Sequence, residues 1–229
     1  MTAARPVGPA VDATPAQRPE PVVLAGRFGR IEKLEGERHG AALWDAVNGD
    51  DALWTYMAYG PFGDEAAFST WLAGRARLED PYSYAVVEPG GRAVGIVTLM
   101  EIRPAMRVIE VGNIVYSGAL QRTALATEAQ YLLARYAFET LGYRRYEWKC
   151  NDLNAPSRAA AQRLGFAFEG IFRAHMIVKG RNRDTAWYAM LEADWPARKH
   201  AFERWLAPEN FDRAGRQKAS LAALTRGDP

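Results

Sequence analysis

The sequence contains one cysteine and three histidines among its 229 residues. The single cysteine, Cys150, excludes an internal disulfide bond and fits a reducing compartment. Because Cys150 lies in an apolar stretch, we interpret it as a packed thiol rather than a nucleophile. The histidines His39, His175 and His200 are too scattered to form a recognisable metal site. We therefore expect a cytoplasmic protein that binds no metal.

The sequence also lacks a long apolar run and a strong charge of either sign. No stretch is long and apolar enough to cross a bilayer. The net charge of +2 gives no reason to expect nucleic acid or an anionic membrane as a partner. Neither the Gly-x-Ser-x-Gly elbow nor the Gly-x-x-x-x-Gly-Lys-Ser/Thr phosphate-binding loop occurs. With 48% hydrophobic and 24% charged residues, the composition is that of an ordinary globular protein.

Three regions differ in composition. Prolines punctuate residues 1–22, which match neither a signal sequence nor an amphipathic presequence and are predicted to be a disordered tail. Residues 23–195 carry the periodic apolar pattern of one domain. Residues 196–229 are predicted to form a helical, partly amphipathic extension.

The apolar periodicity and the turn residues predict a definite order of elements. The expected elements are a strand at 29–34, helices at 38–47 and 64–78, strands at 82–87, 94–102 and 108–116, a helix at 126–141, a strand at 145–150, a helix at 155–164, and strands at 166–178 and 184–191. The strand–helix–strand crossover from 108 to 150 implies one parallel pair in an otherwise antiparallel sheet. The fold class is α+β, with a mixed, mostly antiparallel central sheet and helices on both faces.

The stretch 148–170 is the most informative part of the chain. It has the pattern of a strand that ends in asparagines, a capped helix, a glycine stop and a second strand. Asn154 and Ser157 lie at the mouth of that helix. Backbone donors and short polar side chains at such a mouth suit a polar cofactor.

Several motifs occur together in this order and spacing: Ala126-Thr-Glu-Ala129, Tyr136-Ala-Phe-Glu-Thr-Leu-Gly142, Asn154-x-x-Ser157, Leu164-Gly-Phe166 and Phe168-Glu-Gly170. With these motifs the chain resembles the GNAT superfamily of acyl-CoA N-acyltransferases, and within it the RimJ/RimL-like branch. The resemblance covers roughly residues 28–195.

The resemblance implies a GNAT fold in which the parallel strands splay apart and the pantetheine arm of acetyl-CoA lies in the opening, paired as an extra strand would be. The helix after the first of these strands would point its N-terminus at the pyrophosphate. The backbone N–H groups of Asn113, Ile114 and Val115 would hold the thioester carbonyl.

The pyrophosphate loop would consist of Gln121, Arg122, Thr123, Ala124, Leu125, Ala126 and Thr127. The family's usual pattern here is Gln/Arg-x-x-Gly-x-Gly/Ala, and this chain has Ala124 and Ala126 at the two glycine positions. Alanine fits only where the loop has negative φ and turns directly into the helix, which we expect. Arg122 adds a positive charge, and Thr123 and Thr127 add hydroxyl donors.

Glu110 is the strongest candidate for catalysis. Alternation along its strand predicts that Glu110, Gly112 and Ile114 share one face, opposite the face of Ile109, Val111, Asn113 and Val115. A carboxylate in an apolar strand should have a raised pKa. We interpret Glu110 as a general base, direct or through water, or as an anchor for the cationic amine; the alternative is a salt bridge to Arg103 or Arg107.

Two further groups are candidates for proton transfer. Ser157 could donate a proton to the departing sulfur, while Asn154 is predicted to cap the same helix and to contact the pantetheine amides; capping alone is the alternative for both. His175 could act as a proton relay or be a hydrogen-bonded histidine on the sheet.

An aromatic loop and a polar turn complete the set of candidates. Trp54, Tyr56, Tyr59 and Phe62 either border the acceptor pocket, where rings can hold an ammonium group, or pack in the core. Residues 181–184 form a polar turn that Asp184 could hold by hydrogen bonds, or a solvated hairpin.

The expected function is transfer of an acetyl group from acetyl-CoA to a primary amine, either a protein N-terminus or a small amino compound, by direct attack in a ternary complex. One alternative is a catalytically silent CoA-binding or partner-binding module. Another is an acyltransferase that uses a donor such as succinyl-CoA. The partners would be the acyl-CoA and the amine, without nucleic acid or membrane, and the protein a monomer or homodimer.

Overall fold

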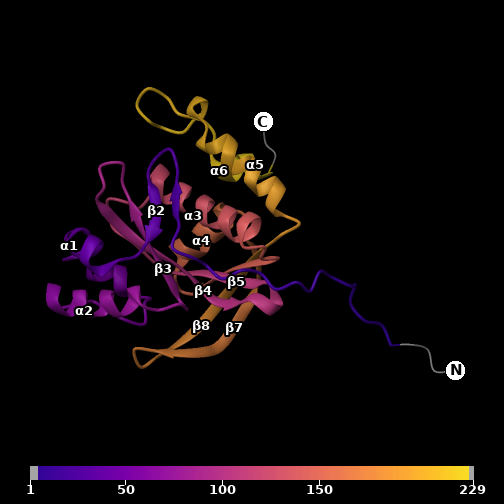
Figure 1. Cartoon of the computed structure of the whole chain (residues 1–229), viewed down its shortest axis with the longest axis horizontal. Helices are drawn as coiled ribbons and strands as arrows, with labels where there is room; N and C mark the ends of the chain where they lie inside the picture. Colours follow the sequence, from indigo (N-terminus) through magenta and orange to yellow (C-terminus); the bar gives the residue numbers. More distant parts are fainter. Residues whose placement is uncertain (1–4, 227–229) are drawn as a thin grey trace.

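The structure, a computed structural model, describes residues 5–226 and is built on one eight-stranded sheet in the order β1-β2-β3-β4-β5-β6-β8-β7 (Figure 1). Neighbouring strands are antiparallel except for β5 and β6, which are parallel. This confirms the mixed, mostly antiparallel α+β class. The strands are β1 Val23–Ala25, β2 Arg30–Lys33, β3 Tyr82–Val87, β4 Ala93–Arg103, β5 Val108–Tyr116, β6 Arg145–Asn151, β7 Ala167–Val178 and β8 Arg181–Leu191.

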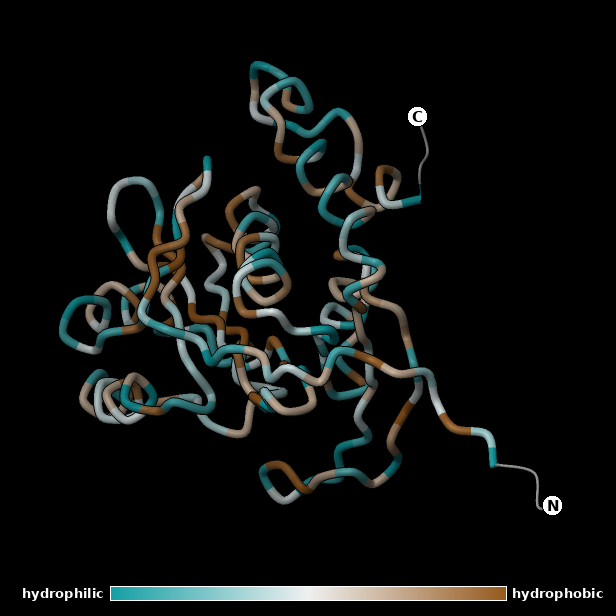
Figure 2. Tube along the Cα trace, turned by 45° about the vertical axis from the view of Figure 1, so that its right-hand side comes forward, coloured by the Kyte–Doolittle hydropathy of each residue, from teal (hydrophilic) through white to brown (hydrophobic). Residues whose placement is uncertain are grey.

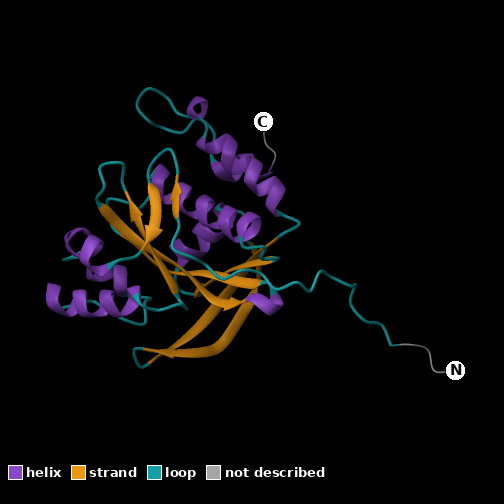
Figure 3. Ribbon diagram, in the orientation of Figure 1, coloured by secondary structure: helices purple, strands orange, loops and turns teal. Residues whose placement is uncertain are grey.

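Helices cover both faces of the sheet, as expected (Figure 3). One core lies under α1 and α2, and the other lies under α3, α4 and α5. Many brown, hydrophobic segments of the chain run through the middle of the molecule, where the strands lie (Figure 2). The helices are α1 Gly36–Val47, α2 Glu65–Ala76, α3 Ala124–Arg135, α4 Ala155–Arg163, α5 Trp195–Leu206 and α6 Leu221–Arg226, and the short turns are η1 Asp51–Trp54, η2 Pro104–Met106, η3 Tyr136–Thr140 and η4 Pro208–Asn210.

The helix boundaries follow from side-chain caps. Asp64, Thr123 and Asn154 each accept a hydrogen bond from a backbone N–H of the first turn, at the starts of α2, α3 and α4. The helix expected at 126–141 therefore begins earlier, at Ala124, and its last part, Tyr136–Thr140, is a π-helical turn. Within residues 5–226 no helix combines the length and the apolar character needed to cross a bilayer.

The parallel pair β5–β6 is splayed. Hydrogen-bonded pairing runs from Val108 opposite Arg145 to Val111 opposite Trp148, while β5 continues to Tyr116 and β6 to Asn151. The two strands therefore part after four residue pairs. This leaves backbone N–H and C=O groups on the inner edge of β5 available to a ligand.

A bulge in β5 lies where the strands part. Asn113 has φ of 48°, and the pairing of β5 with β4 shifts register between the Ile96–Val115 and Thr98–Gly112 pairs. The expected alternation of faces was wrong beyond this point: Val111 packs in the core under α3, whereas Val115 packs in the core under α1 and α2. A bulge adds one residue to one strand, so the side chains that follow exchange faces.

Residues 12–20, expected to belong to a disordered tail, lie along the domain without forming a helix or strand. The N–H groups of Ala16 and Gln17 donate to the carbonyls of Pro104 and Leu141 at 3.1 and 2.8 Å. The N–H of Glu20 donates to the Tyr136 hydroxyl at 3.1 Å, and Pro19 is buried. We call residues 12–22 the strap. Residues 1–4 of the expected tail lie outside the described residues.

Deleting the strap should destabilise the protein, whereas deleting only residues 1–11 should not. The deletion of 1–22 removes two backbone–backbone hydrogen bonds and the bond from the Glu20 N–H to the Tyr136 hydroxyl, each contributing about 1 kcal/mol, together with the exposed Asp12–Arg107 ion pair and the packing of Pro19. We expect the free energy of unfolding to fall by about 2–4 kcal/mol. Denaturant unfolding of both truncations measures this; equal stability of the two would show that the strap contributes nothing.

Candidate active site

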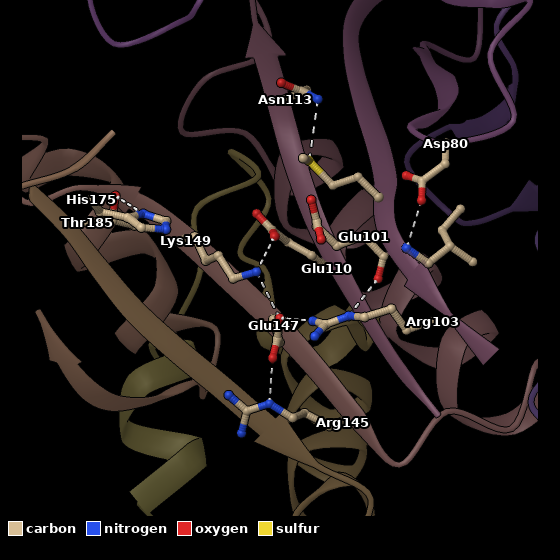
Figure 4. Close-up of polar contacts among 12 residues, drawn as sticks. Asp80, Glu101, Arg103, Glu110, Asn113, Arg145, Glu147, Lys149, His175 and Thr185 are labelled. Carbon is tan, nitrogen blue, oxygen red and sulfur yellow. Dashed lines mark hydrogen bonds and ion pairs between the residues drawn. The ribbon is translucent and has the colours of Figure 1, made fainter. Parts of the chain in front are cut away.

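Two buried carboxylates and a lysine lie on the two strands where they begin to part (Figure 4). Lys149 Nζ on β6 is 2.7 Å from Glu110 Oε2 on β5 and 2.9 Å from Glu147 Oε2. Glu110 is 5% exposed and Glu147 is 3% exposed. The ammonium group also lies 4.1 Å from the centre of the Trp187 ring. One cation is thus enclosed by two carboxylates and an aromatic face.

The two carboxylates have opposite pKa shifts. Burial raises the pKa of Glu110 to about 7, although the Lys149 ammonium lowers it. Burial would also raise the pKa of Glu147, but hydrogen bonds from Arg145 and Lys149 and the charge of Arg103 bring it below its ordinary value. Glu110 is therefore the carboxylate that can exchange a proton near neutral pH, which agrees with the raised pKa expected from its apolar strand.

The ion pair considered for Glu110 from the sequence has a different partner. Arg103 pairs with Glu147 at 2.9 Å, and Arg107 pairs with Asp12 and Glu192 at 3.3 and 3.6 Å. Both arginines stand near the start of the parallel pair, whereas Glu110 points toward β6. The partner of Glu110 is Lys149 on β6. The two residues are 39 positions apart in the sequence, so their pairing could not be predicted from sequence proximity.

The bulge places Asn113 on the same face of the sheet as Glu110, the face covered by α1 and α2. Asn113 Nδ2 donates to Met100 Sδ at 3.4 Å, and Met100 pairs with Glu110 across the sheet. The Tyr59 hydroxyl donates to Asn113 Oδ1 at 3.2 Å and accepts from Arg75 at 3.3 Å. The predicted carbonyl-binding segment, Asn113 to Val115, is the bulged part of β5, beyond the last pairing of β5 with β6.

The mouth of α3 stands at the end of this opening. Thr123 Oγ1 caps the helix by accepting from the N–H of Ala126 at 3.1 Å, so Ala124 and Ala126 are helical residues, and neither has positive φ. The expected direct turn into the helix is confirmed at both alanines, but the expectation of negative φ was wrong for the loop as a whole, because Arg122 has φ of 62°. The first N–H groups of the helix, including those of Ala124 and Leu125, point out of its end without intrahelical partners.

The side chains around that mouth have different roles. Gln121 Nε2 donates to the Tyr116 carbonyl at 2.8 Å, and the buried Thr127 hydroxyl accepts from Arg163 at 3.2 Å. Arg122 is exposed, has φ of 62°, and forms no ion pair within the described part of the chain. Among the predicted loop residues, Arg122 is therefore the one whose charged side chain can contact an anion. The side chains of Gln121 and Thr127 are engaged in hydrogen bonds to other residues of the protein.

At the mouth of α4 the predicted capping is present. Asn154 Oδ1 accepts from the N–H of Ser157 at 3.1 Å. The Ser157 hydroxyl accepts from the Trp148 indole at 3.1 Å. Burial raises the pKa of the nearby Cys150 thiol, although the Ser157 side chain acts to lower it. The cysteine is buried and packed, as predicted.

His175 belongs to the sheet near this cluster but does not touch it. Its Nδ1 is 3.0 Å from the hydroxyl of the buried Thr185, and its ring centre is 5.9 Å from that of Trp187. Trp187 is therefore a neighbour of both His175 and Lys149. His175 is exposed on β7, an arrangement that fits the hydrogen-bonded histidine considered from the sequence.

The aromatic loop divides between the core and the surface. Trp54 is 2% exposed and packs against Phe62 and Trp71, so its side chain lies in the core and not on a pocket. Tyr56 and Tyr59 are half-buried; the Tyr56 hydroxyl donates to the Leu153 carbonyl at 3.1 Å, and Tyr59 reaches Asn113. Tyr56 thus contacts the turn after β6, and Tyr59 contacts the bulge of β5.

Sequence reasoning missed Lys149, Glu147 and Trp187. The available signal was alternation along β6, which separates Glu147 and Lys149 from the apolar Tyr146, Trp148 and Cys150. In residues 5–226 no group of three or more His, Cys, Asp or Glu side chains is arranged to hold a metal ion.

Comparisons with known proteins identify the family. The acetyltransferase (GNAT) domain model matches residues 31–167. The crystal structure of a GCN5-related N-acetyltransferase from Brucella melitensis is 45% identical, with a TM-score of 0.92, and the match covers 94% of this chain and 99% of that one. The structure of a GNAT-family protein from Chromobacterium violaceum is 42% identical, with a TM-score of 0.79, over 86% of this chain and 100% of that one.

A curated relative supports the RimJ/RimL-like branch. YdaF of Bacillus subtilis (strain 168), provisionally named a ribosomal N-acetyltransferase, is 29% identical over 109 residues. The matched segment is 48% of this chain and spans only 59% of the length of YdaF. The fold, the splayed strand pair and these matches agree, and the chain belongs to the GNAT acetyltransferase family.

Proposed function

We propose that this protein transfers an acetyl group from acetyl-CoA to a primary amine by direct attack in a ternary complex. The observation that carries the proposal is the parting of β5 and β6 after Val111 and Trp148, with a buried carboxylate of raised pKa beside the opening. Backbone groups on the edge of β5 are free to pair with the amides of a pantetheine arm. The outward N–H groups of α3 suit a pyrophosphate.

The residues that would act on the amine lie on the opposite side of the opening from α3. Glu110, as a base, would take a proton from the acceptor ammonium, either directly or through water, because its pKa of about 7 leaves it ionised in part at neutral pH. The bulge amides near Asn113 would stabilise the negative charge that develops on the carbonyl oxygen. Ser157 would return a proton to the leaving sulfur, and Asn154 would contact the pantetheine.

Titration calorimetry with acetyl-CoA, followed by a thiol-release assay over a panel of amines, tests the proposal. We expect binding and release of CoA with at least one acceptor. Binding without release would favour the catalytically silent module. A preference for succinyl-CoA at a fixed acceptor would instead assign a different donor.

Arg122→Ala should raise the dissociation constant of acetyl-CoA several-fold, equivalent to about 1 kcal/mol, because an exposed guanidinium that contacts a phosphate contributes about this much. The loss should shrink at high salt, which screens exposed charges. Calorimetry at two ionic strengths measures it. Arg213→Ala, an exposed arginine in the C-terminal extension, is the control. Unchanged affinity in Arg122→Ala would mean that the pyrophosphate lies elsewhere.

The remaining expectations stay predictions. We propose that residues 23–195 form the catalytic domain and that 196–229 extend it, with α5 packed on α3 through Phe202 and Tyr131, whose ring centres are 5.5 Å apart. A cytoplasmic location, a monomer or homodimer, and the absence of nucleic acid and membrane partners are expected on the composition alone.

A further inference from the structure

Arg183 lies on the same face of the sheet as Glu110 and Lys149. Along β8 the even-numbered Ala186 and Tyr188 pack in the core under α3, so the odd-numbered residues face the other way. Trp187, on that odd-numbered face, contacts the Lys149 ammonium. Arg183 precedes Thr185 and Trp187 on this face, which we call the acceptor face.

The guanidinium of Arg183 is half-buried but has no carboxylate partner. Its Nε donates to Thr185 Oγ1 at 3.2 Å, and among residues 5–226 no acidic side chain lies within ion-pair distance of it. Burial lowers the pKa of this guanidinium, whereas the negative charge of Glu110 raises that pKa. Glu110 is therefore near, but its carboxylate is bound to Lys149 at 2.7 Å.

The two cationic side chains on the acceptor face, Lys149 and Arg183, differ in whether carboxylates neutralise them. Lys149 is compensated by two carboxylates, whereas Arg183 is partly removed from water without compensation. Such a charge is costly unless an anion accompanies it. A guanidinium presents a planar fork of donors that matches a carboxylate in bidentate geometry. Thr185 already takes Nε, which leaves the terminal nitrogens for a ligand.

We propose that Arg183 binds a carboxylate carried by the acceptor, so that the preferred substrates are amines with a carboxylate near the reacting nitrogen. This inference rests on the proposed acetyltransferase function. Glu110 would receive the ammonium end of such a substrate and Arg183 its acidic end, which together fix the orientation of the amine. The carboxylate could be that of a free amino acid or the side chain of an acidic residue next to a peptide N-terminus.

Matched pairs of acceptors test the inference. One pair is a free amino acid and its amide; the other is a peptide with Asp and the same peptide with Asn in the second position. For the wild-type protein we expect kcat/KM to favour the acidic member of at least one pair by about tenfold or more, the size of a hydrogen bond between charged groups. The pair that shows the preference identifies the source of the carboxylate.

In Arg183→Gln the acid-to-amide ratio should fall to about one, while the affinity for acetyl-CoA stays within about twofold. Arg181→Gln, an exposed arginine on the same strand, is the control and should keep the wild-type ratio. A wild-type ratio near one, or an unchanged ratio in Arg183→Gln, would overturn the inference. A large loss of acetyl-CoA affinity would assign Arg183 to the donor site instead.

Calorimetric binding of the same acceptors separates this inference from the proposed function. If no acceptor releases CoA, the acetyltransferase proposal fails. A binding preference for acidic acceptors that disappears in Arg183→Gln would still support the carboxylate site, and equal binding of both members of each pair would reject it.

Discussion

Replacing Glu110 with glutamine should lower kcat about 100-fold or more and leave the affinity for acetyl-CoA nearly unchanged. Glutamine keeps the shape of the side chain but cannot accept a proton, and general base catalysis commonly contributes factors of this size. Glu110 lies beside the opening between β5 and β6 rather than along the edge of β5 that would pair with the donor. Thiol release at saturating substrate and calorimetry with acetyl-CoA measure the two effects separately.

The pH dependence should identify the same group. A base must be deprotonated to act, and burial raises the pKa of Glu110 from 4.5 to about 7. Wild-type kcat should therefore rise as the pH increases through about 7, and this limb should disappear in Glu110→Gln. Glu101→Gln, at an exposed position on β4, is the matched control: removing its charge should lower the pKa of Glu110 slightly and leave the plateau unchanged. Equal turnover in Glu110→Gln and wild type would remove Glu110 from the mechanism.

Replacing Lys149 with methionine should cost stability and move the pH profile toward alkaline values. In this variant Glu147 still has Arg103 and Arg145 as ion-pair partners, whereas Glu110 loses the ammonium group with which it is paired. Breaking a buried ion pair by removing one partner costs about 3–5 kcal/mol when the remaining charge is retained. Glu110 can instead keep a proton, so its pKa should rise above about 7 and the acid limb of kcat should shift with it.

The sign of the stability change follows from linkage. In the unfolded chain Glu110 loses its proton near its ordinary pKa of 4.5, whereas in the folded variant it holds the proton to a higher pH. Between about pH 4.5 and 7 both folded proteins hold this proton and the unfolded chain does not, so wild type and variant lose stability together. The charge-dependent destabilisation of the variant relative to wild type should therefore be small up to about pH 7 and grow as the pH rises from there toward the higher pKa of the variant. Denaturant unfolding at several pH values measures it. Lys149→Arg keeps the charge and should retain most of the stability; a loss in Lys149→Met that does not depend on pH would show that packing, not charge, is responsible.

Many features of this protein could be predicted from interactions between residues close together in the sequence. Asp64, Thr123 and Asn154 cap the helices that follow them, because a short polar side chain needs only the N–H groups of the next turn as partners. The strand–helix–strand crossover required a parallel pair, and Glu110 stood out because a carboxylate in an apolar strand is costly without a partner. These features depend on residues near one another in the chain.

Other features depend on contacts between distant segments. The bulge at Asn113 reverses the faces of β5. Glycine inside a strand and asparagine at positive φ both occur at bulges, so Gly112-Asn113 is compatible with one, but the bulge itself is defined by the register of β5 against β4. The strap lacks helical or strand periodicity, so its contacts with Pro104 and Leu141 could not be expected from its composition.

By itself, the sequence determined the α+β class, the order of the elements from β2 onward, the helix caps and the candidate base, since each follows from periodicity or from neighbours within a few residues; the edge strand β1 was missed. Only the tertiary structure decided where β5 and β6 part, that Lys149 is the partner of Glu110, and that Arg183 has no carboxylate partner among residues 5–226. The physical reason is that strand register and the burial of charge are set by segments far apart in the chain, which meet only when the sheet is complete.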